Sequence, residues 1–210
     1  MDLNLWLHRC PLVPILRGIH PAEAVPICSA LEDAGISIVE VPLNSPDPLE
    51  TIAILARTFG DRMLVGAGTL TDPLQVEQVA QAGGRLIVTP HADLDIVRTA
   101  KRAGLLAVPG FFNPTEAFAL LHAGADAIKL FPAEVLGVPM LKALRAVLPP
   151  SALVLPVGGI DAHTIPLWQA AGAAGFGVGS AIYKPGDDAH IVAAKARTLL
   201  AALGSGTPAR

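Results

Sequence analysis

The chain has 210 residues, of which 52% are hydrophobic and 16% are charged, and its net charge at neutral pH is −3. A chain of this length can bury a large core, so we expect residues 1–210 to form one domain. The weak negative charge provides no basic field, which makes nucleic acid an unexpected partner. Every apolar stretch is interrupted well short of the roughly 20 residues that a membrane-spanning helix needs, so no membrane partner is expected either.

Neither secretion nor metal binding is indicated. Residues 1–11 lack the basic region, apolar run and cleavage site of a signal peptide. Cys10 and Cys28 are too few for a disulfide framework, and the six histidines are scattered without ligand spacing. These features favour a cytoplasmic protein without a metal site.

Short β-branched runs alternate with segments of helical spacing along the chain. The runs predict strands at 12–17, 36–43, 64–70, 85–90, 105–110, 127–132, 153–158 and 175–182. The segments between and after them predict helices at 21–34, 47–59, 73–82, 93–103, 114–123, 138–148, 162–171 and 189–203. Eight such units in about 200 residues predict a (β/α)8 barrel, also called a TIM barrel.

Signals at the helix ends support this reading. Polar residues followed by proline predict helix starts at Ser45-Pro46, Asp72-Pro73 and Asn113-Pro114. Several helices end on Ala-Gly, where glycine supplies a left-handed residue. A doubly wound sheet is the alternative, but the segment after the first strand, 17–21, lacks its glycine-rich fingerprint. Residues 2–10 predict a short N-terminal helix, and residues 204–210 a flexible tail.

One lysine interrupts an otherwise apolar strand. In the stretch 127–133, Lys129, Phe131 and Ala133 share one face, because side chains alternate along a strand. If that face lines the barrel interior, burial lowers the pKa of Lys129 and makes its amine a nucleophile for carbonyl carbon. If the strand lies at a sheet edge, Lys129 is a solvated charge.

Polar residues gather where the predicted strands end, which is where barrel enzymes carry their chemistry. They include an arginine, a carboxylate within an apolar strand and two glycine-rich turns, at Arg17, Glu40, Thr69, Thr89-Pro90-His91, Gly158-Gly159 and Gly179-Ser180. The two glycine-rich turns follow strands seven and eight, where barrels often bind phosphate through backbone N–H groups. The alternative is that these glycines only permit tight turns.

Six motifs resemble, in order, those of the KDPG/KHG aldolase family, over about residues 11 to 186. They are the runs 15–19, 39–46, 66–69, 87–90, 129–133 and 156–160, which read ILRGI, VEVPLNSP, GAGT, IVTP, KLFPA and PVGGI. The resemblance implies a class I aldolase without a metal or other cofactor. Such an enzyme cleaves a phosphorylated six-carbon 2-keto-3-deoxy sugar acid to pyruvate and D-glyceraldehyde 3-phosphate. It also implies a homotrimer.

Family roles carry over residue by residue. Lys129 matches the Schiff-base lysine, and Glu40 matches the carboxylate that moves protons through a bound water. Arg17 and Thr69 match groups that hold the substrate carboxylate, with Pro90 beside them. The remaining matches are Phe131, which packs beside the imine, Val157, which faces the sugar hydroxyls, and the phosphate-binding Gly158, Gly159, Gly179 and Ser180.

Two departures from the gluconate branch of the family bear on the substrate. That branch has Leu-Arg-Thr where this chain has Leu43-Asn44-Ser45, and the resemblance implies that Arg17 replaces its arginine. The branch also has threonine before Gly-Gly, where this chain has Val157. Loss of that hydroxyl should alter the preference at C4, which favours the galactonate epimer.

Other readings remain open from the residues alone. The gluconate epimer or 4-hydroxy-2-oxoglutarate is the alternative substrate. A phosphosugar isomerase or a catalytically silent phosphate-ligand binder would keep the phosphate turns but would have no use for an imine-forming Lys129. A purely structural reading of Glu40 pairs it with Arg17 or Lys129.

Overall fold

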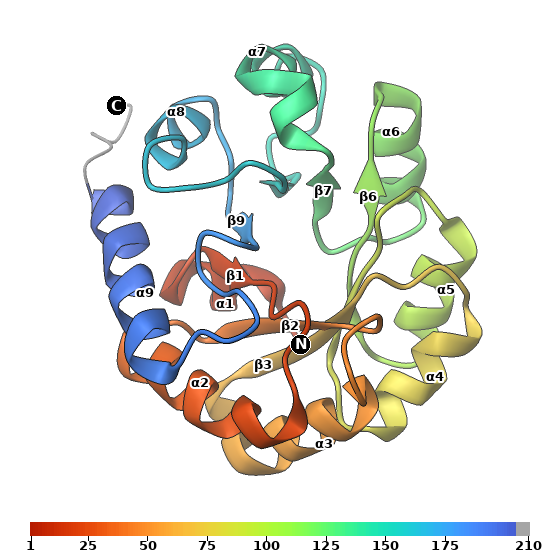
Figure 1. The fold of residues 1–210 in the computed structure, drawn as a ribbon. Coiled ribbons are helices and arrows are strands. Elements are labelled where there is room, and N and C mark those ends of the chain that lie inside the picture. Colours follow the sequence, from red (N-terminus) through yellow and green to blue (C-terminus); the bar gives the residue numbers. More distant parts are fainter. Residues whose placement is uncertain (205–210) are drawn as a thin grey trace.

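The computed structural model of the chain describes residues 1–204 (Figure 1). Its strand segments are β1 (Leu12–Pro14), β2 (Ile38–Pro42), β3 (Leu64–Gly68), β4 (Leu86–Val88), β5 (Leu106–Val108), β6 (Gly110–Phe111), β7 (Ile128–Leu130), β8 (Val154–Pro156) and β9 (Phe176–Val178). Its helices are α1 (Leu3–Arg9), α2 (Pro21–Asp33), α3 (Pro48–Phe59), the 3-10 turn η1 (Gly60–Arg62), α4 (Leu74–Gln81), α5 (Leu94–Arg102), α6 (Pro114–His122), α7 (Ala133–Arg145), α8 (Ile165–Ala170) and α9 (Ala189–Gly204). Beyond Gly204 the predicted tail lies outside the described residues.

Hydrogen bonds between neighbouring strands close the sheet into a barrel. Parallel pairing joins β2 through β5, β6 through β8, and β1 with β9. Single bridges join the remaining edges, Ile15 with Glu40 between β1 and β2, and Val157 with Gly177 between β8 and β9. Because β5 and β6 are two halves of one strand separated by Pro109, the segments occupy eight positions around the ring. The predicted (β/α)8 barrel is confirmed.

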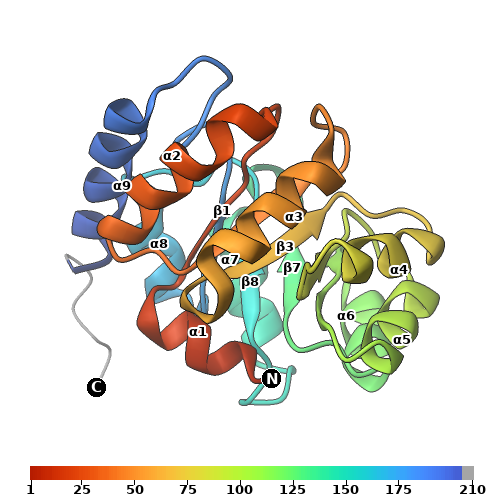
Figure 2. The same ribbon diagram turned by 90° about the horizontal axis from the view of Figure 1, so that it is seen from below.

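The helices surround this ring, as Figure 1 shows along the barrel and Figure 2 from the side. Most predicted helix bounds agree with the observed ones to within one or two residues. The glycines after α2, α4, α5, α6 and α8 all have positive φ, as predicted from the Ala-Gly endings at Gly35, Gly83, Gly104, Gly124 and Gly172. No helix within residues 1–204 has the length and apolar character to span a membrane.

Two apolar cores hold the fold together. The larger one fills the layer between the strands and the surrounding helices. The smaller one fills the barrel interior, where strand residues such as Val13, Leu86 and Leu155 meet Leu3, Trp6 and Leu7 of α1. The predicted N-terminal helix therefore covers one end of the barrel (Figure 2), and the opposite end is left for the site.

The strands are shorter than the apolar runs predicted. Proline lacks the backbone N–H that a sheet ladder needs. Pro14, Pro42 and Pro156 are the last residues of β1, β2 and β8, and Pro109 divides the fifth predicted strand. Apolar residues continue past the prolines, as at Ile15 and Val157, which are still buried, and the apolar runs set the predicted bounds.

Three predicted helix starts are wrong, and one of them is the start predicted at 162, because α8 begins at Ile165. The helix predicted at 138–148 is the second part of α7, which begins at Ala133 and is interrupted at Gly137, where φ is 71° and ψ is 163°. The start predicted at Ser45-Pro46 falls two residues early, because Asp47 is the cap and α3 begins at Pro48. Ser45 instead accepts a hydrogen bond from the backbone N–H of Gly18, at 2.9 Å.

Candidate active site

A cavity of about 500 Å³ opens where the strands end, opposite α1. All eleven residues that the sequence predicted for the site line this cavity. They are Lys129, Glu40, Arg17, Thr69, Pro90, Phe131, Val157, Gly158, Gly159, Gly179 and Ser180. They come from strands or loops in seven of the eight units, so only closure of the barrel brings them together.

Lys129 and Glu40 are buried at the floor of the cavity. Lys129 is in the middle of β7 and is 5% exposed, and Glu40 is in the middle of β2 and is 2% exposed. Burial lowers the pKa of Lys129, the negative charge of Glu40 raises it in part, and Arg17 lowers it further. Burial likewise raises the pKa of Glu40, against the smaller lowering effects of Lys129 and Arg17. Both groups are therefore shifted toward their neutral forms, and the edge-strand alternative for Lys129 is wrong.

A small internal cavity of about 20 Å³ lies beside both side chains, between them and Leu3 of α1. This volume is enough for one water molecule. Within residues 1–204 Glu40 forms no ion pair with Lys129 or Arg17, so the two catalytic candidates interact through charge without direct contact. A side chain at Gly68 would collide with the carboxyl group of Glu40, so this position of β3 leaves room for that group.

An aromatic ring lies next to the lysine. The Nζ atom of Lys129 is 4.7 Å from the ring centroid of Phe131, which lies two residues further along the chain. Lys129 and Phe131 therefore share one face, as predicted, whereas Ala133 begins α7 and does not line the cavity. The ring covers one side of the amine with an apolar surface.

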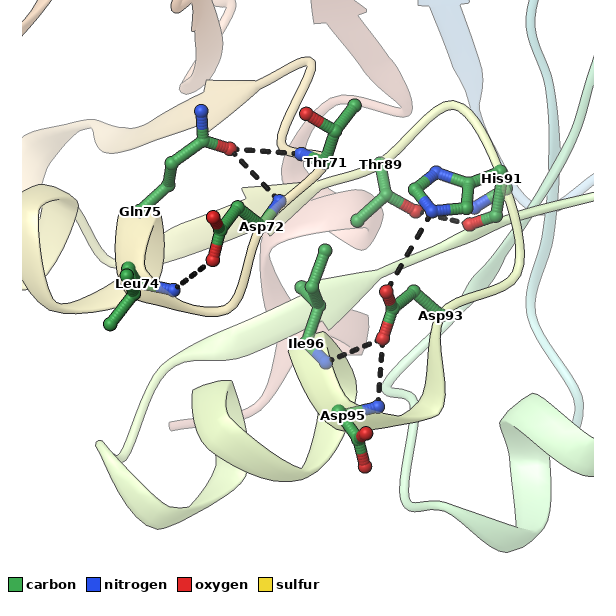
Figure 3. Close-up of polar contacts among 10 residues, drawn as sticks. Thr71, Asp72, Leu74, Gln75, Thr89, His91, Asp93, Asp95 and Ile96 are labelled. Carbon is green, nitrogen blue, oxygen red and sulfur yellow. Dashed lines mark hydrogen bonds and ion pairs between the residues drawn. The ribbon is translucent and has the colours of Figure 1, made fainter.

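The loops after β3 and β4 bring Thr69 and Pro90 to the cavity. The buried hydroxyl of Thr89 donates to the carbonyl of His91 at 2.5 Å and accepts from the N–H of Gly110 at 3.1 Å. This fixes the turn that carries Pro90. Figure 3 shows how Asp93 accepts from backbone N–H groups at the start of α5, and how Gln75 accepts from those of the loop before α4. His91, one of the polar residues at the end of the fourth predicted strand, lies outside the lining and is half-exposed near Asp93.

The two glycine-rich turns lie side by side in the cavity wall. Gly158 and Gly159 both have positive φ, 107° and 65°. After β9 a single helical turn begins at Gly179, whose carbonyl accepts from the N–H groups of Ile182 and Tyr183. The first N–H groups of such a turn have no partner within it, so this wall can offer backbone donors to an anion.

Several lining residues were not predicted. A lysine in a loop is ordinarily a solvated charge, but Lys184 lines the cavity together with Tyr183 and Pro185. Gly18 and Ile160 also line it, beside residues that were predicted. The direction of the loop after Gly179-Ser180 decides these contacts, and no pattern in the sequence specifies that direction. Within residues 1–204 no group of three or more His, Cys, Asp and Glu side chains is placed to hold a metal ion.

A buried amine beside a buried carboxyl, at the mouth of a (β/α)8 barrel, suits a barrel enzyme that forms an imine with a carbonyl substrate. The sequence profile of the KDPG and KHG aldolase family matches residues 3–193. The chain belongs to this family. It is 42% identical over 197 residues to the 2-dehydro-3-deoxy-6-phosphogalactonate aldolase of Escherichia coli strain K12, covering 94% of this chain and 96% of that protein.

Solved structures agree with this assignment. A structure described as native KDPGal superposes with a TM-score of 0.92 at 41% identity, over 94% of this chain and 96% of the other. A KDPG aldolase from Legionella pneumophila, with pyruvate captured as a covalent carbinolamine intermediate, superposes with a TM-score of 0.83 at 26% identity, over 99% of each chain. The chain is thus similar along nearly its whole length to aldolases, which are lyases.

Proposed function

We propose that this protein is a class I aldolase that cleaves 2-dehydro-3-deoxy-6-phosphogalactonate to pyruvate and D-glyceraldehyde 3-phosphate. The observation that carries the proposal is the pair of Lys129 and Glu40, both buried at the floor of the cavity. The similarity to an aldolase named for this substrate supports the choice of substrate. The covalent pyruvate adduct in the Legionella relative supports the imine route.

The reaction begins at Lys129. Its neutral amine attacks the C2 ketone, and loss of water gives an iminium ion that withdraws electrons from C3. A lysine at its ordinary pKa is almost wholly protonated at neutral pH, so the lowered pKa increases the fraction that can attack. The ring of Phe131 shields one side of the nitrogen from water.

Glu40 then moves the protons. Its carboxylate, acting through water, takes the proton of the C4 hydroxyl, the C3–C4 bond breaks, and the aldehyde leaves. The enamine that remains is protonated at C3, and hydrolysis of the resulting imine frees pyruvate and the Lys129 amine. A raised pKa suits Glu40 to both giving and taking a proton. The 500 Å³ cavity that both side chains line has room for the water that connects Glu40 to the substrate.

The two anionic ends of the substrate bind to different parts of the cavity wall. Arg17 and Thr69, with Pro90 beside them, hold the carboxylate end. The turns at Gly158-Gly159 and Gly179-Ser180 hold the phosphate through backbone N–H groups. Lys184 adds a positive charge at the phosphate end. The C4 hydroxyl group lies between these ends, where buried Val157 faces the cavity.

Borohydride trapping tests the chemistry. Incubation with pyruvate and sodium borohydride should leave a stable adduct on Lys129, found by intact mass and peptide mapping. Lys129→Ala should abolish both the adduct and cleavage while the variant stays folded, as judged by circular dichroism. Lys142→Ala, which removes an exposed lysine on α7, is the matched control and should keep full activity. Cleavage by Lys129→Ala at a near-normal rate would refute the assignment.

Substrate choice is tested by comparing kcat/KM for the two C4 epimers. A higher value for the galactonate compound supports the proposal, and a higher value for the gluconate compound replaces it with the alternative. Wild-type protein that forms no pyruvate adduct and cleaves neither epimer would return the isomerase and silent binder to consideration.

We also propose that the enzyme works as a cytoplasmic homotrimer. Large apolar side chains stay exposed at the starts of α4 and α7 and before α6, at Leu74, Val135 and Phe112. Contact between subunits would bury such surface. Light scattering after size exclusion should give three times the mass of the single chain.

A further inference from the structure

Arg17 has two possible directions. It follows β1, which lies between β9 and β2 in the ring. A long side chain at this place can turn toward the glycine turn after β9, or toward the ends of β2 and β3. The first direction would assign the guanidinium to the phosphate and the second to the carboxylate. The cavity lining alone does not separate the two, because residues of both ends contribute to it.

Two hydrogen bonds from the loop after β2 fix the direction. The Nη1 atom of Arg17 donates to Oδ1 of Asn44 at 2.7 Å. The backbone N–H of the next residue, Gly18, donates to the buried hydroxyl of Ser45 at 2.9 Å. On the β9 side Pro185 packs against Gly18 so closely that any side chain there would collide with it. The backbone is thereby held from both sides while the guanidinium is drawn toward β2.

The partner of the guanidinium is neutral. Within residues 1–204 Arg17 makes no ion pair, and Asn44 satisfies one of its five N–H donors without cancelling its charge. The remaining donors form a planar fork that matches a carboxylate. Asn44 itself is exposed and does not line the cavity, so any effect it has on the substrate acts through Arg17.

We propose that Asn44 and Ser45 are positioning residues that hold Arg17 at the carboxylate end of the site and keep its charge available for the substrate. This inference rests on the proposed function, in which pyruvate forms an imine with Lys129. It assigns a task to the two residues that stand where the gluconate branch of the family has arginine and threonine. Because Arg17 then serves the carboxylate, the positive side chain at the phosphate end is that of Lys184.

The two ends of the site can be measured separately. Pyruvate carries only the carboxylate, so its half-saturating concentration in borohydride trapping reports on Arg17. D-glyceraldehyde 3-phosphate carries only the phosphate, so its KM in aldol addition at saturating pyruvate reports on the glycine turns. Asn44→Ala should raise the half-saturating pyruvate concentration by roughly 5- to 20-fold, because an oriented charged hydrogen bond is lost. The KM for D-glyceraldehyde 3-phosphate should change by less than about 2-fold on the same scale.

Two further variants sharpen the test. Asn44→Asp keeps the shape but adds a carboxylate that pairs with Arg17 and competes with pyruvate, so it should raise the half-saturating pyruvate concentration more than Asn44→Ala does. Ser45→Ala should raise this concentration less than Asn44→Ala does, since it removes only the hydrogen bond to the backbone N–H of Gly18. Asn4→Ala, at an exposed asparagine of α1, is the control and should change nothing.

Each outcome decides the matter. If Asn44→Ala raised only the KM for D-glyceraldehyde 3-phosphate, Arg17 would be assigned to the phosphate and the inference would be overturned. Equal increases for both ligands would indicate a disordered loop, and no increase for either would mean that Asn44 does not position Arg17. Both results would overturn it. If wild-type protein traps no pyruvate at all, the proposed function fails first and this inference falls with it.

Discussion

Lys129 and Glu40 illustrate how one site can tune two groups in opposite directions. Burial penalises the charge of each, and the charge of each partly restores the charge of the other. Because no direct ion pair forms, neither group is held in its charged state by a contact. The proposed mechanism uses both neutral forms, since it needs an amine that attacks a ketone and a carboxyl group that carries a proton.

The coupling predicts the pH dependence of a variant. The charge of Glu40 raises the pKa of Lys129, so Glu40→Gln should lower that pKa further. The neutral amine is the nucleophile, and pyruvate trapping therefore falls as pH drops through the pKa of Lys129. In Glu40→Gln the midpoint of this fall should move to lower pH, while turnover of the full substrate becomes slow. Trapping rates over a pH series measure the midpoint, with Glu77→Gln, at an exposed residue of α4, as control. A midpoint that moves to higher pH would contradict the coupling.

The lining of the cavity predicts a change in epimer preference. Val157 is buried beside the Gly158-Gly159 turn, and Val157→Thr adds a hydroxyl at nearly constant volume. A new buried donor favours the epimer whose C4 hydroxyl it can reach, so the kcat/KM ratio should shift toward the gluconate compound. An effect of about 1–3 kcal/mol corresponds to roughly 5- to 150-fold. Val147→Thr, at an exposed valine that follows α7, should leave the ratio unchanged, and an unchanged ratio in Val157→Thr would contradict the assignment.

At the scale of elements, the sequence predicted what depends on local chemistry and missed what depends on neighbours. The cap at Asn113 was correct, because its side chain accepts from the N–H of Glu116 as an isolated helix start would require. The cap at Ser45 was wrong, because that hydroxyl is used by Gly18, 27 residues away in the chain. The alternation of side chains along a strand placed Lys129 and Phe131 on one face. The position of Lys184 at the cavity depends on the direction of a loop, which no repeating pattern in the sequence specifies.

The interruption of α7 predicts a stability effect at one glycine. Gly137 adopts φ 71° and ψ 163°, a region that is almost closed to residues with a Cβ atom. Its surroundings are open, with the nearest atom, Cδ of Pro139, at 3.4 Å from an added Cβ, so the cost is one of backbone conformation. Gly137→Ala should lower the free energy of unfolding by about 1–3 kcal/mol in urea titration. Gly204→Ala, which meets nothing within 4 Å and has no positive φ, is the control. Equal stability of both variants would mean that the segment adopts an uninterrupted helix at no cost.

At the scale of the whole molecule, the barrel interior joins the two ends of the fold. Side chains of α1 fill the end where the strands begin, and the catalytic candidates lie above them. Leu3 reaches far enough to line the same small cavity as Lys129 and Glu40. Helix α1, which takes no part in substrate binding, therefore helps to maintain the low polarity that shifts the pKa of both groups.

This arrangement predicts that Leu3→Ala acts on the chemistry from the opposite end of the barrel. The truncation enlarges the internal cavity and should lower the free energy of unfolding by about 2–5 kcal/mol. Water that enters the enlarged space weakens the desolvation of Lys129, so the pKa of its amine rises toward its ordinary value. The midpoint of pyruvate trapping should then move to higher pH, opposite in sign to the shift in Glu40→Gln. Leu5→Ala removes an exposed leucine of the same helix and should change neither property. A destabilised Leu3→Ala protein with an unshifted midpoint would show that the strands alone keep Lys129 dry, and that α1 serves stability only.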